Sequence, residues 1–201
     1  MSTVGISFRE VMSGGFALGA TDPEQGEKQG RAQGSEMTMH GAIDIQDLDL
    51  FIKEASHPGN LSGTLDFTPF GSGLQATSGI FNLFSPTDDP KLKLMVYEMG
   101  FQHDGKNYYL AGQKNVRQDP IFDLWKATTT LYSKLHEGTD KSGPVVGAGI
   151  LSLGVRQLID LVSTMQAPGA TTFTETSEAM AKFGRFFLGE LWDTYVRHVL
   201  P

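Results

Sequence analysis

One carboxylate and one phenol on a predicted β-hairpin are the side chains best placed for chemistry in this sequence. The hairpin is KLKLMVYEMGFQHDGKNYYLAGQKNV, and its alternation places Glu98 and Tyr109 on one face among apolar residues. Burial raises the pKa of a carboxyl group, which can then carry a proton beside a hydroxyl. Glu98 and Tyr109 are therefore the acid/base pair to expect if the chain is an enzyme. The competing interpretation is structural: Glu98 is exposed where the strand ends, or a hydroxyl or backbone group satisfies it.

The opposite face of the same hairpin is suited to line a ligand site. Asp104-Gly105 is a strong type I′ turn signal, because both central residues of that turn need positive φ. A turn centred there pairs Phe101 with Tyr108, Met99 with Leu110 and Tyr97 with Gly112. Flexible apolar chains and two tyrosine hydroxyls would then share one surface. The predicted ligand-binding set is Tyr97, Met99, Phe101, Tyr108 and Leu110. The alternative is that these five residues are simply core.

The remaining candidate motifs point to neither a cofactor nor a metal. GSGLQA (71–76) fits the dinucleotide fingerprint, but TSGIFNLF after it predicts a strand, whereas the fingerprint needs a helix. DIQDLD (44–49) lacks the glycine and the distant glutamate of an EF-hand loop. The histidines do not form the i, i+4 pair typical of a zinc-binding helix. We therefore expect no metal site and no cofactor.

The elements that must position these residues are mostly strands. Alternating apolar residues predict strands in GISFREVMSG, EMTMHGAIDIQD, LSGTLDFTPFG, LQATSGIFNLFSP and VVGAGILSLG. Asp47 is placed to cap one short helix, and VRQLIDLVSTM predicts another. An amphipathic helix is expected at about 177–199. The polar, glycine-rich segment at about 19–36 has almost nothing to bury, which predicts a mobile loop.

The stretch DPIFDLWKATTTLY combines helix and strand signals. Asp119 followed by Pro120 is typical of a helix start, and IFDLW would form one short turn. From Trp125 onward the residues alternate, which predicts an amphipathic strand with the Thr129 hydroxyl on its buried face.

Together the elements predict a single domain over 1–201. Its fold class is mostly β, an antiparallel barrel or sandwich with short helices and the C-terminal helix packed against it.

Composition excludes several classes of partner. The net charge is −7, whereas nucleic acids and anionic membranes attract basic surfaces. The chain has no cysteine, so neither disulfides nor thiolate chemistry is expected. The start MSTVGISFRE does not have the pattern of a secretory signal, and no apolar run is long enough to span a membrane. A cytoplasmic location is the default expectation.

Four segments together carry a resemblance to a known family. They are KLMVYEMGFQHDGKNYYLAGQKNV, DLWKATTTLY, GAGILSL and FGRFFLGELWDTY. The pattern resembles an accessory β-rich region found beside bacterial GMC-type (cholesterol-oxidase-like) flavin oxidoreductase domains. The family's Rossmann fingerprint and its His/Asn catalytic segment do not occur in this sequence. The resemblance thus implies the accessory module and an association with sterol or other apolar-substrate chemistry, and it transfers no catalytic residue.

Three hypotheses about function follow. The first is a non-catalytic binding module that holds a lipid-like or sterol-like apolar molecule between the hairpin and the C-terminal helix. The second is a small barrel enzyme that uses Glu98 and Tyr109 on an apolar substrate, and it requires a cavity reached by Glu98. The third is a partner subunit of a separate flavoenzyme, which would dock through an apolar patch on the C-terminal helix around Phe186, Leu191 and Tyr195.

Overall fold

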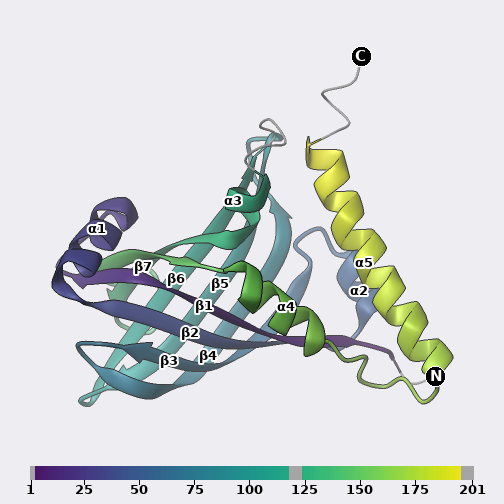
Figure 1. The fold of residues 1–201 in the computed structure, drawn as a ribbon, viewed down its shortest axis with the longest axis horizontal. Helices are drawn as coiled ribbons and strands as arrows, with labels where there is room; N and C mark the ends of the chain where they lie inside the picture. The colour runs from purple at the N-terminus through teal and green to yellow at the C-terminus, as the bar shows by residue number, and fades with distance from the viewer. Residues whose placement is uncertain (1–2, 118–123, 196–201) are drawn as a thin grey trace.

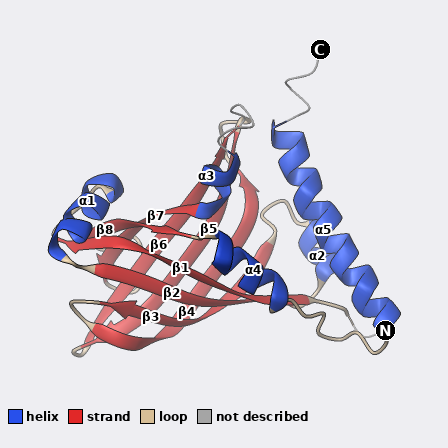
Figure 2. Cartoon of the chain, in the orientation of Figure 1, coloured by secondary structure: helices blue, strands red, loops and turns tan. Residues whose placement is uncertain are grey.

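The chain forms a closed barrel of eight antiparallel strands (Figures 1 and 2). The structure is a computed structural model that describes residues 3–117 and 124–195. Each strand pairs with its neighbours in sequence, and β1 closes the barrel against β8. The strands are β1 (Ile6–Leu18), β2 (Glu36–Ile45), β3 (Pro58–Phe67), β4 (Gly71–Pro86), β5 (Leu92–His103), β6 (Lys106–Arg117), β7 (Thr130–Glu137) and β8 (Val145–Ser152). Of the two predicted architectures, the barrel is the one the structure has.

The hairpin of β5 and β6 has the predicted register. Phe101 pairs with Tyr108, and Tyr97 pairs with Gly112. Asp104 and Gly105 have φ values of 48° and 75°, as a type I′ turn requires. Alternate residues of β5 point into the barrel, because successive side chains on a strand face opposite ways. This local geometry fixes which hairpin residues reach the interior.

The segment predicted as a mobile loop contains a helix, and that prediction is wrong. Helix α1 (Pro23–Gln33) starts at Asp22, whose side chain accepts a hydrogen bond from the Gln25 amide at 2.9 Å. It ends at Gly34, which has a left-handed φ of 65°. The segment has few apolar residues, which suggested a loop. The helix needs few of them, because glycines and not apolar side chains form its buried face. Its buried residues are Gly26 and Gly30, which lie against the backbone of the strands.

The other end of the barrel carries the remaining helices (Figure 1). They are α2 (Leu48–Lys53), α3 (Leu124–Thr129), α4 (Val155–Ser163) and α5 (Phe173–Tyr195). Asp47 caps α2 as expected, accepting a hydrogen bond from the Leu50 amide at 2.9 Å. Helix α5 begins before the predicted residue 177, because Thr172 and Glu175 form a capping box. Residues beyond 195 lie outside the described part of the chain.

Two of the three consecutive threonines, Thr128 and Thr129, are helical where alternation predicted a strand. Helix α3 continues to Thr129, and β7 starts at Thr130. The predicted cap at Asp119 and Pro120 lies outside the described residues. Alternation over four or five residues does not exclude a helical turn, and here the helix carries the chain across the end of the barrel.

Helix α5 packs on the rim of the barrel through aromatic side chains. Phe183 is buried, with its ring centroid 6.1 Å from that of Phe8. Phe186 packs edge-on against Phe51 at 5.6 Å and against the buried ring of His57 at 4.7 Å. These contacts hold α5 against this end of the barrel.

Candidate functional site

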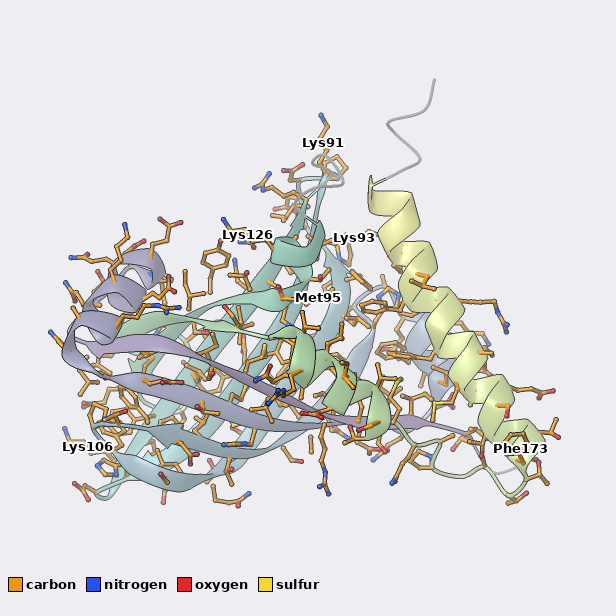
Figure 3. The ribbon with its side chains drawn as sticks, viewed as in Figure 1. Lys91, Lys93, Met95, Lys106, Lys126 and Phe173 are labelled. Atoms are coloured by element: carbon orange, nitrogen blue, oxygen red, sulfur yellow. The ribbon has the colours of Figure 1, made fainter. Side chains whose placement is uncertain are left out.

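A cavity of about 280 Å³ lies where α3, α4 and α5 meet the open end of the barrel. Its strand side is formed by Phe8, Phe81, Leu83 and Met95. Its helix side is formed by Leu158, Leu161 and Val162 of α4 and by Phe183, Phe187 and Leu188 of α5, and α3 contributes Thr128 and the buried Thr129. In Figure 3, Met95 marks this end, whereas Lys106 in the β5–β6 turn marks the opposite end. The volume is near the lower limit of about 300 Å³ for small-molecule sites.

Three polar side chains from three strands meet at the floor of this cavity. Glu10 of β1 and Lys114 of β6 form an ion pair, with Nζ and Oε1 2.8 Å apart. The Tyr97 hydroxyl of β5 donates to the other carboxylate oxygen of Glu10 at 2.8 Å. Lys114 Nζ also lies 3.4 Å from the Tyr97 oxygen and 4.6 Å from the centre of its ring. The cluster therefore links strands across the interior of the barrel.

Burial of this cluster is nearly complete. Glu10 and Lys114 are each 2 % exposed, and Tyr97 is 3 % exposed. Burial, together with the nearby charge of Glu10, raises the pKa of the Tyr97 hydroxyl well above its ordinary value. Tyr97 thus remains a hydrogen-bond donor at any ordinary pH. A buried ion pair survives only when its partners satisfy one another, as these three do.

Glycines stand across from two members of the cluster on adjacent strands. Gly112 stands directly across from Tyr97, and Gly41 stands across from Glu10. A Cβ on Gly112 would lie 2.9 Å from the Leu131 side chain, which is closer than such contacts occur, and a Cβ on Gly41 would lie 3.2 Å from that of Leu61. The absence of a side chain at these two inward positions therefore lets the leucines of the neighbouring strands pack beside the cluster.

Among the described residues, Lys114 has partners for two of its three N–H donors. An ammonium group has three N–H donors, and two of those of Lys114 face Glu10 and the Tyr97 oxygen. Within the described residues, Lys114 has no further hydrogen-bond partner. Because Lys114 lines the cavity, this third N–H is available to an oxygen atom bound there.

The predicted ligand-binding residues separate into two groups. Tyr97 lines the cavity. Met99, Phe101 and Leu110 are buried further along the barrel, toward the β5–β6 turn. Tyr108 is half-buried there, with its ring stacked on Phe101 at 5.7 Å. These four residues belong to the packed half of the barrel interior and do not line the cavity.

Glu98 and Tyr109 come together, but on the outer face of the barrel. The Tyr109 hydroxyl donates to Glu98 at 2.6 Å, and Lys141 reaches the other carboxylate oxygen at 2.7 Å. Burial, followed by the bond to Glu98, raises the pKa of Tyr109 far above its ordinary value. Tyr109 therefore acts as a donor that satisfies Glu98, and neither residue lines the cavity. Acid/base chemistry at this pair stays a prediction.

Reasoning from sequence missed Glu10 and Lys114, although a signal for them exists. Glu10 lies between the inward-facing Phe8 and Met12, and Lys114 lies between Gly112 and Val116. A charged residue at an inward position of an alternating strand indicates either an error in the register or a buried polar partner inside the fold. That the two residues pair could not be predicted from the sequence, because 104 residues separate them.

Helices α4 and α5 carry exposed apolar side chains, of which Val162 and Leu188 line the cavity. Val155, Ile159 and Val162 of α4 are each about 60 % exposed, and Leu188 of α5 is 66 % exposed. None of the nine residues of α4 is buried. In the patch predicted on α5, Phe186 is half-buried against Phe51 and His57, and the side chains of Leu191 and Tyr195 lie outside the described part.

Other kinds of site find no support in the described residues. No group of three or more His, Asp or Glu side chains in residues 3–117 and 124–195 is arranged to hold a metal ion. No helix there is long and apolar enough to cross a membrane. Comparison of the chain with protein-family models, with curated proteins and with solved structures gives no match.

Proposed function

We propose that the chain is a non-catalytic binding protein for a lipid-like or sterol-like apolar small molecule, held in the cavity between the barrel and helices α4 and α5. The observation that carries the proposal is the combination of a mostly apolar lining with a buried polar cluster at the floor. Ligand sites are typically lined this way, with a few polar groups that fix orientation. The cavity accommodates a small molecule whole, whereas a longer one would extend through the apolar mouth.

The first experiment identifies any molecule that the protein carries. Purified protein is extracted with organic solvent and the extract analysed by mass spectrometry, beside native mass spectrometry of the intact protein. The proposal expects a bound apolar species, or saturable uptake of added fatty alcohols or sterols. A protein that carries nothing and takes up none of these would contradict it.

A pair of substitutions on α5 tests the location of the site. Gly184 lines the cavity, and a Cβ there meets no atom within 4 Å. Gly184→Leu should therefore fill the cavity and abolish ligand uptake while the barrel stays folded. Gly189→Leu is the matched control, because Gly189 is exposed and its Cβ position is also open. Equal uptake by both variants would place the ligand elsewhere.

A second candidate function is that of a partner subunit for a separate flavoenzyme. The exposed apolar side chains of α4 support it, because such side chains around a ligand mouth suit a surface that another protein covers. The family resemblance implies an accessory role, and this docking surface on α4 differs from the patch on α5 that the sequence predicted. The test is whether a GMC-type oxidoreductase, if one is encoded beside this gene, co-purifies with the protein. Ile159→Glu should abolish the complex, and binding undiminished by this charge would exclude the α4 surface.

A further inference from the structure

The chemistry of the polar floor narrows the class of ligand. We infer that the cavity selects an uncharged apolar molecule that ends in a hydroxyl or carbonyl oxygen, and that the third N–H of Lys114 binds this oxygen. The inference rests on the proposed function, since it concerns the same cavity. It goes further by naming the polar end of the ligand and the group that receives it.

Charge balance at the floor argues for a neutral ligand. The carboxylate of Glu10 already offsets the ammonium charge of Lys114 at 2.8 Å. A ligand carboxylate would add a second negative charge beside Glu10, at a site where the floor residues are at most 3 % exposed. A buried charge without its own counter-charge is strongly disfavoured. A fatty acid anion is thus the wrong partner for this floor.

The hydrogen-bond inventory argues for an oxygen rather than a bare hydrocarbon. Glu10 accepts one bond at each carboxylate oxygen, and the Tyr97 hydroxyl is committed to Glu10. Among the described residues, the donor of this cluster that remains is the third N–H of Lys114, in a cavity whose lining is otherwise apolar except for Thr128 and Thr129. An alcohol or ketone oxygen satisfies this donor, whereas a hydrocarbon leaves it unsatisfied. A hydroxyl can in addition donate to a free lone pair of Glu10.

The test compares four ligands of equal carbon number on the wild-type protein. Octan-1-ol, octan-2-one, octanoate and octane compete at pH 8 with a fluorescent apolar dye bound in the cavity. The alcohol and the ketone should bind at least about threefold more tightly than octane, the gain of one neutral hydrogen bond. Both should bind at least about tenfold more tightly than octanoate, which is ionised at this pH.

A charge variant makes the test sharper. Glu10→Gln removes the negative charge and leaves the Lys114 ammonium uncompensated, so octanoate should gain at least about tenfold relative to octan-1-ol. Glu24→Gln, an exposed position on α1 at the far end of the barrel, should leave the preference unchanged. If Glu10→Gln does not fold, the wild-type series alone decides.

The outcomes separate the two proposals. Octanoate binding as tightly as octan-1-ol, or octane binding as tightly as the alcohol, would overturn the inference and leave the binding function intact. If dye and ligands all fail to bind and nothing is extracted from the purified protein, the binding function itself is refuted.

Discussion

At the scale of single residues, the Glu10–Lys114 pair is the least expected feature of the molecule. Taking two charges out of water costs several kcal/mol each, and their mutual attraction seldom exceeds that cost. An apolar pair of similar volume would serve the stability of the barrel at least as well. Stability alone therefore gives little reason for this pair, and the proposed ligand binding would supply one.

Removing one member of the cluster should cost far more than replacing the whole cluster by apolar residues. Lys114→Met leaves Glu10 buried without its counter-charge, and we expect a loss of about 3–5 kcal/mol in the free energy of unfolding. The triple variant Glu10→Leu/Tyr97→Phe/Lys114→Met also removes the Tyr97 hydroxyl, which would otherwise lose its acceptor. It should recover most of the lost stability and should lose most of the preference for octan-1-ol over octane. Urea denaturation measures the stability of each variant, and dye competition measures the ligand preference. A single variant as stable as the triple one would contradict this account.

The Asp66 carboxylate at the β3–β4 turn gives a prediction about pH. It accepts a hydrogen bond from the Gly73 amide at 2.7 Å and lies 3.0 Å from His40, and these contacts lower its pKa below the ordinary value. A lowered folded pKa stabilises the protein above the ordinary pKa of about 4, and this stabilisation is lost as pH falls through the folded pKa.

Asp66→Asn should therefore lower the melting temperature at pH 7 by about 1–3 °C, a small effect because the side chain is partly exposed. The difference from wild type should shrink below pH 4, as the wild-type carboxyl group also becomes protonated. Thermal melts at pH 7, 5 and 3 measure it. If the difference in melting temperature between Asp66→Asn and wild type grows toward pH 3, this mechanism is contradicted.

At the scale of elements, helix α1 shows how glycine can serve as a packing residue. Gly26 and Gly30 lie four positions apart on one face, so both meet the strands. A Cβ on Gly26 would overlap the carbonyl of Ala148, and one on Gly30 would overlap the amide nitrogen of Phe16. The helix lies so close to β1 and β8 that backbone contacts backbone.

Gly30→Ala should accordingly destabilise the protein, by about 1–3 kcal/mol, because α1 must move away from β1. In an open helix position the same substitution is favourable by up to about 1 kcal/mol. Gly189→Ala in α5 is the matched control, since nothing lies within 4 Å of its Cβ position. Chemical denaturation compares the two, and a stabilising Gly30→Ala would show that α1 does not pack as described.

At the scale of the whole molecule, stability is unevenly distributed. The barrel strands pair on both sides, and the packed half of the interior holds Met, Phe and Leu side chains that are almost fully inaccessible. Helix α4 contributes no buried residue, although it forms one wall of the cavity. Elements with few buried contacts unfold locally at the lowest free-energy cost, and the elements that move to admit a ligand are usually among them. We expect α4 to be the part that opens for a ligand.

Hydrogen exchange followed by mass spectrometry checks this expectation. Amides of α4 should exchange at least about tenfold faster than those of β5 and β6, and a bound ligand should slow α4 most. Helix α1 is the internal comparison, because its glycine face is buried at the other end of the barrel. Protection of α4 equal to that of the strands without ligand would argue for a different entrance.

Features that depend on a few neighbouring residues could be predicted from the sequence, whereas features that depend on contacts between distant residues could not. The β5–β6 register follows from Asp104 and Gly105, because a two-residue turn fixes the pairing of the strands it joins. The α2 cap at Asp47 is equally local. Helix α1 was not predicted. Gly26 and Gly30 stabilise it by packing closely against strand backbone, and that backbone lies beside them only in the folded barrel.

The sequence by itself determined the strand content, the hairpin and the C-terminal helix, since alternation, turn chemistry and helical periodicity act over a few residues. Only the tertiary structure decided that the strands close into a barrel and that Glu10, Tyr97 and Lys114 meet inside it. The physical reason is that closure pairs β1 with β8, and this brings residues about 100 positions apart onto one interior surface. The polar floor of the cavity is a product of that closure.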